Sequence, residues 1–268
     1  MKKLIVLIFC SFVSLFANSL DEIKQKGVLR VGVYEGQPPF SKIDNGVFVG
    51  FEIELAKSIA NMLFGKNSGK LEFVTIVPQD RIPVLQENKV DLVIANYTNT
   101  KERAKYVDFS MPYFSVNIGV LTNSDDNIKN MQDLKGKTIL CGKSSTADIF
   151  FKNKGYNVAY CDTASQCYSK LKSKEADAYA ADNIVVMTFP ILDNSVEVSM
   201  KNLGEAEFLA IGVQKGNKDL LSFVNQSLIQ LSKDNFFQKE FIDSIDPFYK
   251  GTADKKYFLL DDIYSIFG

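Results

Sequence analysis

The stretch DLVIANYTNTKERAKYVDFSMPYF, residues 91–114, joins a short apolar run to a cluster of polar side chains. Residues 92–95 are apolar enough for one buried strand, and Asn96, Thr98 and Arg103 follow that run. In open α/β sheets, ligands bind beyond the carboxyl ends of the strands. The stretch therefore predicts an α/β fold with a binding site at this strand end.

Strands and helices alternate on both sides of this stretch. The expected elements are strand 28–34, helix 50–65, strand 71–77, helix 80–88 and strand 90–95, then strand 137–142, helix 145–155, strand 156–161, helix 164–173 and strand 176–182. Residues 85–96 and 171–182 also share Leu, Asp, Ala and a final Asn or Asp at the same spacing. The repeated order predicts two α/β lobes of similar design.

Two apolar stretches with an Ile-Gly-Val core, residues 115–123 and 208–216, follow the first and second series of elements. We interpret them as two crossings between the lobes. Residues 20–116 and 212–268 are then expected to form a discontinuous lobe 1, and residues 117–211 lobe 2.

The N-terminal segment, residues 1–19, has two lysines, an apolar run and then small residues. This order is typical of a secretory signal peptide, and the run falls short of the ~20 apolar residues of a membrane-spanning helix. A buried N-terminal helix is the alternative. We expect a mature protein that is exported to the periplasm and monomeric. Since the formal net charge of the chain is -1, nucleic acid is not an expected partner.

Three cysteines, Cys141, Cys161 and Cys167, follow the predicted signal peptide. An oxidising compartment permits disulfides, and Cys161 and Cys167 are near enough in sequence to form one. The favoured interpretation is nevertheless that all three are small core residues.

Polar groups from both lobes are expected to meet between them. Asn96 and Asp182 leave equivalent strands, and Ser145 and Thr146 open a helix whose free N–H groups can bind an anion. Arg103 and Asp182 would suit the carboxylate and ammonium of a zwitterion. Each residue also has a structural explanation: Arg103 as a solvated charge, and residues 98–100, Asp182 and residues 144–148 as ordinary helix starts.

The chain resembles the periplasmic solute-binding proteins of polar amino-acid ABC transporters from Leu20 to about Phe248. The most specific match is ANYTNTKERAKYVDFSMPYF, with its Thr-x-Thr-x-Glu-Arg, Asp-Phe-Ser and Pro-Tyr motifs; GFEIELAKSIA, DRIPVLQENKVDLVIAN and LKGKTILCGKSSTAD add to it. The resemblance implies a two-lobed, type II binding-protein fold with two hinge crossings. It also implies a free amino acid as ligand and an ABC transporter permease as partner.

The resemblance assigns roles to ten residues. Arg103 would bind the ligand α-carboxylate and Asp182 the α-ammonium, and the others would support the carboxylate or line the pocket: Thr98, Asn96, Ser145, Thr146, the Ala147 amide, Tyr34, Phe40 and Arg81. Arg81 lies where members with acidic or some small ligands place a pocket arginine; a surface helix charge is the alternative.

Two departures from the family pattern bear on the ligand. Tyr34 stands where members that bind basic amino acids often carry Asp, and Ser144 stands where many members have Gly. The shared pattern is most similar to the cysteine-binding receptors. Cysteine or cystine therefore ranks first, other small polar amino acids second, and aspartate or glutamate third. An Arg81 that reaches the pocket without an acidic partner would favour the acidic ligands.

Catalytic motifs are absent from the sequence. It has no histidine, no CxxC pair and no GxxxxGK[ST] loop, so a Ser-His or Cys-His pair is excluded and no cofactor or metal is expected. The enzyme alternative is a periplasmic cyclohexadienyl-dehydratase-like protein, which acts on prephenate-like substrates and would use Asp182 or Glu35 as its acid.

Overall fold

The computed structural model describes residues 18–65, 69–253 and 255. The predicted signal peptide lies outside this part, except for Asn18 and Ser19. Ser19 caps the first helix, α1 (Leu20–Lys26), by accepting a hydrogen bond from the backbone N–H of Glu22. In the described part of the chain, none of the helices has the length and apolar character needed to cross a membrane.

One eight-stranded sheet runs through both lobes, in the order β5-β1-β6-β11-β7-β10-β8-β9. Its strands, in chain order, are β1 (Val28–Val33), β5 (Lys70–Thr75), β6 (Leu92–Val93), β7 (Val107–Asn123), β8 (Thr138–Gly142), β9 (Asn157–Cys161), β10 (Ala178–Asp182) and β11 (Val196–Gln214). A small second sheet holds β2 (Gly36–Gln37), β3 (Ser41–Asp44) and β4 (Val47–Val49). The α/β two-lobed prediction is confirmed.

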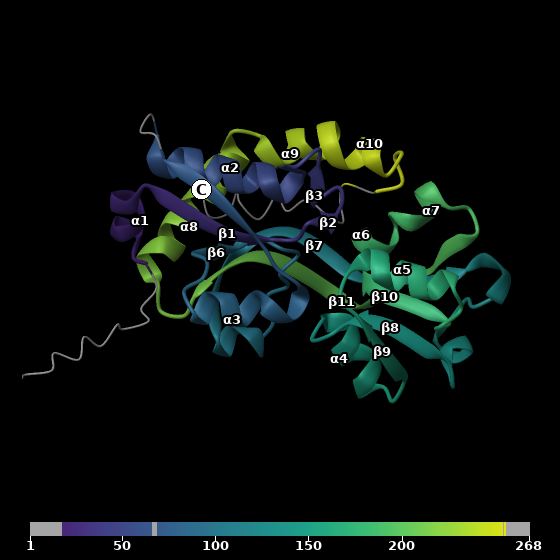
Figure 1. Ribbon diagram of the computed structural model, residues 1–268. Helices are drawn as coiled ribbons and strands as arrows, with labels where there is room; N and C mark the ends of the chain where they lie inside the picture. Colours follow the sequence, from purple (N-terminus) through teal and green to yellow (C-terminus); the bar gives the residue numbers. More distant parts are fainter. Residues whose placement is uncertain (1–17, 66–68, 254, 256–268) are drawn as a thin grey trace, which may run out of the picture.

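The helices cover the sheet lobe by lobe, as Figure 1 shows. Lobe 1 holds α1, α2 (Phe51–Phe64), α3 (Arg81–Gln86), α8 (Lys218–Lys233), α9 (Phe236–Glu240) and α10 (Asp246–Phe248). Lobe 2 holds α4 (Thr146–Asn153), α5 (Ala164–Lys172), α6 (Asn183–Val186) and α7 (Phe189–Leu192). The buried face of α2, which includes Ile53, Ala56 and Ala60, follows the 3.6-residue period that predicts it.

The two Ile-Gly-Val stretches belong to β7 and β11, the long antiparallel strands that connect the lobes. Both glycines are needed where another chain segment comes close. A Cβ on Gly119 would lie 2.5 Å from Val186 Cγ2, and a Cβ on Gly212 would lie 2.8 Å from Tyr97 Cε1. The predicted lobe boundaries at residues 116/117 and 211/212 fall inside these strands and stay a prediction.

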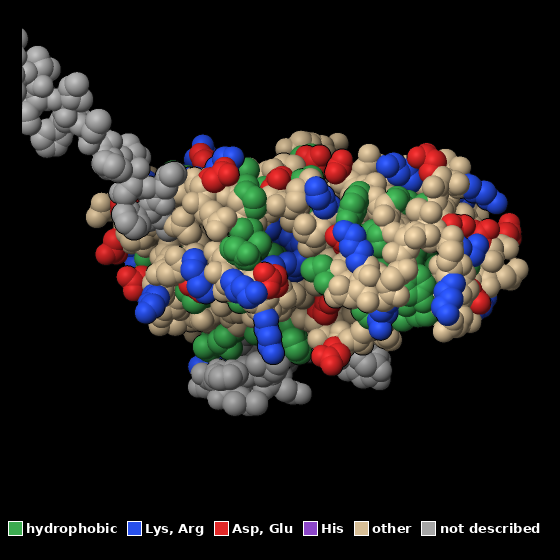
Figure 2. Space-filling model, turned by 90° about the horizontal axis from the view of Figure 1, so that it is seen from below, with side chains coloured by type: hydrophobic (Ala, Val, Ile, Leu, Met, Phe, Trp, Pro, Cys, Tyr) green, Lys and Arg blue, Asp and Glu red, His purple; other side chains and the backbone are tan. Residues whose placement is uncertain are grey.

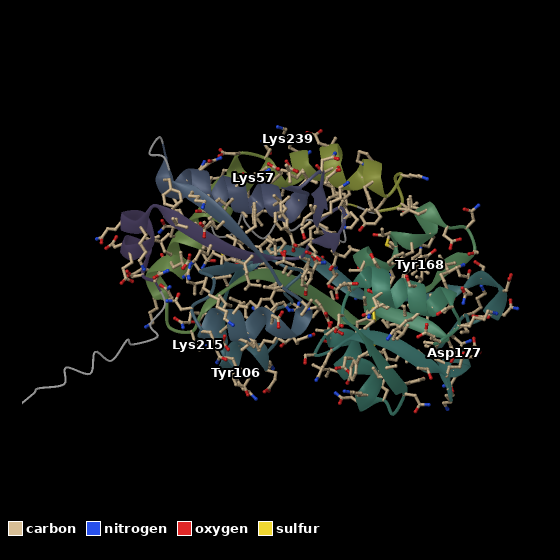
Figure 3. The ribbon with its side chains drawn as sticks, in the orientation of Figure 1. Lys57, Tyr106, Tyr168, Asp177, Lys215 and Lys239 are labelled. Carbon is tan, nitrogen blue, oxygen red and sulfur yellow. A yellow bond between two sulfur atoms is a disulfide. The ribbon has the colours of Figure 1, made fainter. Side chains whose placement is uncertain are left out.

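The repeated sequence pattern has a structural counterpart in each lobe. The Asp91 N–H donates to Arg30 O at 2.9 Å while Asp91 Oδ2 accepts from the Arg30 N–H at 2.8 Å. Asp177 makes the same reciprocal pair with Thr138, at 3.0 and 2.8 Å. Asp177 lies at the outer end of lobe 2 in Figure 3. Asp182 therefore ends the same strand on the side that faces lobe 1.

Three features differ from the sequence-based expectation. The strand predicted at 90–95 pairs regularly only over β6, because the chain turns at Asn96, whose φ is 42°. The small second sheet was not predicted, since its strands are too short to show a period. Cys161 and Cys167 form a disulfide, so the prediction of three free core cysteines is wrong for this pair; Cys141 is free and buried.

Candidate functional site

A cavity of about 570 Å³ lies between the lobes. Figure 2 shows a hollow across the middle of the molecule, with Lys or Arg side chains inside it. Eight of the ten predicted site residues line this cavity: Tyr34, Arg81, Asn96, Thr98 and Arg103 from lobe 1, and Ser145, Thr146 and Asp182 from lobe 2. The structure thus brings together residues that lie far apart in sequence.

Arg103 is a buried cation at the junction of the lobes. It opens the short 3-10 turn Arg103–Lys105, and it is only 7% exposed, so the alternative of a solvated charge is wrong. Its Nη1 donates to Thr98 O at 2.8 Å and its Nη2 to Ser144 O at 3.0 Å. Burial, followed by the nearby Arg81, lowers the Arg103 pKa to about 10, which leaves the guanidinium charged at neutral pH.

Residues 98–100 had a structural explanation, the capping of a helix start, and of these residues Thr100 does play that part. Its Oγ1 accepts a hydrogen bond of 3.2 Å from the Arg103 N–H. Thr98 lies instead in the cavity wall and is held beside the crossing strand by a β-bridge to Leu209. Thr98 is therefore placed toward the site rather than at the helix start.

Tyr97 holds two guanidinium groups in position. The Arg81 Cζ lies 4.8 Å and the Arg103 Cζ 5.4 Å from the centre of the Tyr97 ring, distances at which a cation is attracted to an aromatic face. Arg81 also donates from Nε to Pro78 O at 3.0 Å and from Nη1 to Asn96 O at 2.9 Å. Two like charges are thus fixed at the cavity by one buried ring and by backbone carbonyls.

Asn96 is held from behind by a buried acid, Glu52. The Asn96 N–H donates to Glu52 Oε1 at 2.8 Å, and the Tyr113 hydroxyl donates to the same oxygen. With its amide oriented to suit its neighbours, Asn96 donates to both Glu52 oxygens and accepts from Gln37 Nε2 at 3.2 Å. Burial raises the Glu52 pKa to about 7. Asn96 therefore shapes the cavity wall through a network within lobe 1.

Lobe 2 contributes the start of α4. Ser145 is its N-cap and accepts from the Asp148 N–H at 3.1 Å, so the helix-start interpretation of this motif holds alongside its place in the cavity wall. Thr146 is the first residue of the helix, where N–H groups lack partners within the helix. Ala147 follows in the same turn, is buried, and is not among the cavity-lining residues.

Phe40 does not line the cavity, contrary to the prediction. It is 1% exposed and packs edge-to-face on Phe51 and Phe114 in the lobe 1 core. The position after the first strand suggested a pocket wall, but Phe40 lies in the turn between β2 and β3, and its ring packs into the core. Tyr34, from the same region, is buried and lines the cavity.

Two acids lie on the lobe 2 side of the site. Burial and then the charge of Glu207 raise the Asp182 pKa to about 7. Asp182 precedes α6 but makes no capping hydrogen bond with its side chain, so the helix-start alternative is wrong for it. Sequence reasoning missed Glu207 because it lies in the polar part of β11, just before the apolar stretch 208–216, with no motif around it.

A further wall of the cavity was also missed. Six residues of the loop closed by the Cys161–Cys167 disulfide line it, together with β2 and residues 75–78 of lobe 1. A Cys pair spaced by six residues next to a predicted strand end was the available signal. This wall lies where α5 contacts β2 across the gap between the lobes.

The charges at the cavity are arranged for a ligand rather than for one another. Among the described residues, neither Arg81 nor Arg103 forms an ion pair, and Asp182 forms none either. Buried charges without a partner are costly. The arrangement therefore suits a small molecule that carries both a carboxylate and an ammonium group.

Known proteins resemble this chain over most of its length. The family model of bacterial extracellular solute-binding proteins, family 3, matches residues 29–241. The structure of a cysteine-binding protein from Campylobacter jejuni is 35% identical with a TM-score of 0.87, covering 91% of this chain and 99% of that chain. An L-cysteine solute receptor of Neisseria gonorrhoeae is 36% identical with a TM-score of 0.86, covering 90% and 99%.

A curated relative is named for a different amino acid. The glutamine-binding protein of Geobacillus stearothermophilus is 30% identical over 202 residues, covering 71% of this chain and 77% of that protein. Relatives at this level of identity thus have names that specify different amino acids.

Proposed function

Because the chain belongs to the bacterial extracellular solute-binding proteins, family 3, we propose that it is a periplasmic receptor for a small polar amino acid, with cysteine or cystine as the first candidate. The protein would deliver this ligand to the permease of an ABC importer and would carry out no catalysis. The predicted signal peptide supports export.

One observation carries the proposal: Arg103 and Asp182 reach the same cavity from opposite lobes, and neither has an ion-pair partner in the described part of the chain. An α-amino acid supplies the missing carboxylate and ammonium. A charge-assisted hydrogen bond contributes roughly 1.5–3 kcal/mol, and Arg can form two with one carboxylate. Binding of the zwitterion would also draw the lobes together, since each charge is held by a different lobe.

The ranking of ligands rests on the remaining walls. Tyr34 offers no charge to a basic side chain, so a buried Lys or Arg ligand would lack a partner at this position. The two cysteine-binding structures described above are similar to this chain over nine-tenths of its length. Arg81 donates Nε to one backbone carbonyl and Nη1 to two others. Arg103 donates one bond each from Nη1 and Nη2 and, in the described part of the chain, none from Nε. Arg103 is therefore better suited than Arg81 to hold a ligand carboxylate with two nitrogens. These points favour a neutral side chain.

A second candidate, an aspartate or glutamate receptor, is supported by Arg81 itself. Arg81 lines the cavity, is 5% exposed and has no acidic partner among the described residues. This is the arrangement expected to favour an acidic side chain, which would contact the remaining nitrogen, Nη2. The variant Arg81→Ala separates the candidates: it should abolish binding of an acidic ligand and reduce binding of cysteine much less.

Equilibrium dialysis of the purified mature protein tests the ranking, with labelled cysteine under anaerobic conditions, cystine, aspartate, glutamate, glutamine and arginine. We expect saturable binding of cysteine or cystine, tighter than that of the other four. Tight arginine binding without cysteine or cystine binding would overturn the ranking. Turnover of prephenate would overturn the receptor function in favour of the enzyme alternative.

A further inference from the structure

Glu207 is a carboxyl group beside the proposed carboxylate seat that has no assigned role. It lies on β11 opposite Val116 of β7, while Asp182 on β10 lies opposite Ile118 of the same strand. Residues two apart on β7 point to one face, so Glu207 and Asp182 flank β7 on that face. The Oε2 atom of Glu207 is buried and has no hydrogen-bond partner among the described residues.

The neighbours of Glu207 are the groups proposed to hold the ligand carboxylate. Thr98 forms a β-bridge with Leu209, two residues along β11 from Glu207, so the Thr98 and Glu207 side chains lie on the same face of the sheet. Burial raises the Glu207 pKa, while the Thr146 hydroxyl, the Arg103 guanidinium and the Thr98 hydroxyl lower it. Thr98 belongs to lobe 1 and Thr146 to lobe 2, and both line the cavity, whereas Glu207 does not. Glu207 therefore lies behind the two threonines as seen from the ligand.

Few other charges face Glu207. Arg103 lowers its pKa from the 3-10 turn, and the charge of Glu207 raises the pKa of Asp182 on β10. Residues 115–118 of β7 carry no charge, and Asp148 of α4 is paired with Lys152 at 3.0 Å. Burial has the largest effect on the ionisation of Glu207, and the groups at the carboxylate seat oppose it.

We propose that Glu207 is a positioning residue that controls whether the Thr98 and Thr146 hydroxyls donate hydrogen bonds to the ligand; this rests on the function proposed above. A hydroxyl has one proton to donate. An ionised Glu207 accepts that proton, so the threonine presents only lone pairs to the cavity. A neutral Glu207 releases the hydroxyls to donate to the ligand carboxylate.

This role links ligand binding to proton uptake at Glu207. A bound ligand carboxylate adds a like charge and offsets Arg103, and both effects favour the neutral form of Glu207. The complex then holds more protons at Glu207 than the free protein does. The contribution of Glu207 to affinity accordingly falls as pH rises through the ionisation of this group.

Calorimetry with L-cysteine in two buffers of different ionisation enthalpy tests the proposal on wild type, Glu207→Gln and Glu207→Ala. Gln cannot ionise but its amide can still donate to a threonine oxygen. We expect Gln to stay within about threefold of wild-type affinity and Ala to lose about tenfold, the effect of one hydrogen-bonding group. Wild type should take up more protons on binding than Glu207→Gln. Glu205→Gln, an exposed acid two residues away, is the matched control and should behave as wild type.

Two outcomes would overturn the proposal while the receptor function stands: equal proton uptake by wild type and Glu207→Gln, or a large loss of affinity in Glu207→Gln, which would make Glu207 a direct partner of the ligand ammonium. A second measurement needs no ligand. In carbon-13 NMR of the free protein, Thr98→Val should raise the pKa of the Glu207 carboxyl, because the hydroxyl that lowers it is gone. An unchanged titration would contradict the contact on which the proposal rests. Failure of wild type to bind any amino acid would instead refute the proposed function.

Discussion

Arg103 of lobe 1 donates a hydrogen bond of 3.0 Å from Nη2 to the backbone carbonyl of Ser144 in lobe 2. The same guanidinium holds Thr98 O through Nη1 at 2.8 Å. One side chain thus ties a strand end of lobe 1 to the loop before α4, and it does so in the cavity wall. A ligand carboxylate at this guanidinium would be held where the lobes meet, so binding and closure involve the same group.

The first prediction concerns Arg103→Ala. It should weaken amino-acid binding by about 100-fold or more, since loss of a bidentate charge-assisted pair removes roughly 3 kcal/mol or more. Arg103→Lys should recover only part of the affinity, because an ammonium cannot reproduce the planar fork. Calorimetry gives the affinities, and thermal unfolding checks that the variants fold. Lys101→Ala, an exposed neighbour, is the control. A change under threefold for Arg103→Ala would remove this residue from the site.

The second prediction concerns Ser144→Gly. Ser144 has φ 63°, in the left-handed region that costs an L-residue about 1–2 kcal/mol; glycine avoids this cost but loses about 0.5–1 kcal/mol through the entropy of the unfolded chain. The net effect should be a gain in the free energy of unfolding of about 0.5–1 kcal/mol. The bond to Arg103 uses the backbone carbonyl, so affinity should stay nearly unchanged. Urea unfolding measures the gain. A glycine variant that is less stable than wild type would contradict this prediction. It would show that the Ser144 side chain stabilises the folded protein by more than its positive φ angle costs.

The third prediction concerns pH and Asp182. Burial and the charge of Glu207 raise the Asp182 pKa to about 7, and a bound ammonium favours the ionised form. Affinity for an amino acid should therefore weaken as pH falls below about 7, because the carboxylate must lose a proton before it can pair. Asp182→Asn should bind weakly at every pH and lack this dependence. Affinities measured between pH 5 and 8 test it; a wild-type profile that is flat over this range would contradict the role of Asp182.

The sequence pattern predicts the fold well because the pattern is repeated. Residues 85–96 and 171–182 share a spacing, and Asp91 and Asp177 make the same reciprocal backbone pair in the two lobes. Asn96 and Asp182 are the polar residues at the ends of these segments. Because the two segments are equivalent, both residues were predicted at the site, and both line the cavity. Strand-end position is thus a physical signal that a single sequence carries.

Packing that depends on chain segments far apart in sequence cannot be predicted in this way. Phe40 was expected at the cavity because it follows the first strand, but ring contacts with Phe51 and Phe114 place it in the core. Tyr97 lies between two predicted site residues, yet its place between Arg81 and Arg103 depends on the space left by Gly212. Glu207 has no motif at all, because its significance comes from two threonines that reach it from different lobes.

The last prediction concerns Glu52 and stability. Burial raises the Glu52 pKa from 4.5 to about 7 in the folded protein, so between these values the folded state holds more protons than the unfolded state. The free energy of unfolding should therefore fall as pH rises from about 4.5 to about 7, by up to roughly 3 kcal/mol from this group alone.

Glu52→Gln tests this effect directly, because Gln cannot titrate but its oxygen can still accept from the Asn96 N–H and the Tyr113 hydroxyl, which bond Glu52 Oε1 in the wild type. Relative to wild type, the variant should gain stability as pH rises through this window, and the difference should level off above pH 7. Urea unfolding of both proteins between pH 4.5 and 8 measures it, and other titrating groups cancel in the comparison.

Glu54→Gln is the matched control: this acid lies on the same turn of α2 but is partly exposed and pairs with Lys57 at 2.7 Å, so its curve should run parallel to that of wild type. Parallel curves for Glu52→Gln as well would show that Glu52 stays ionised in the folded protein, and that the hydrogen bonds from Asn96 and Tyr113 outweigh its burial.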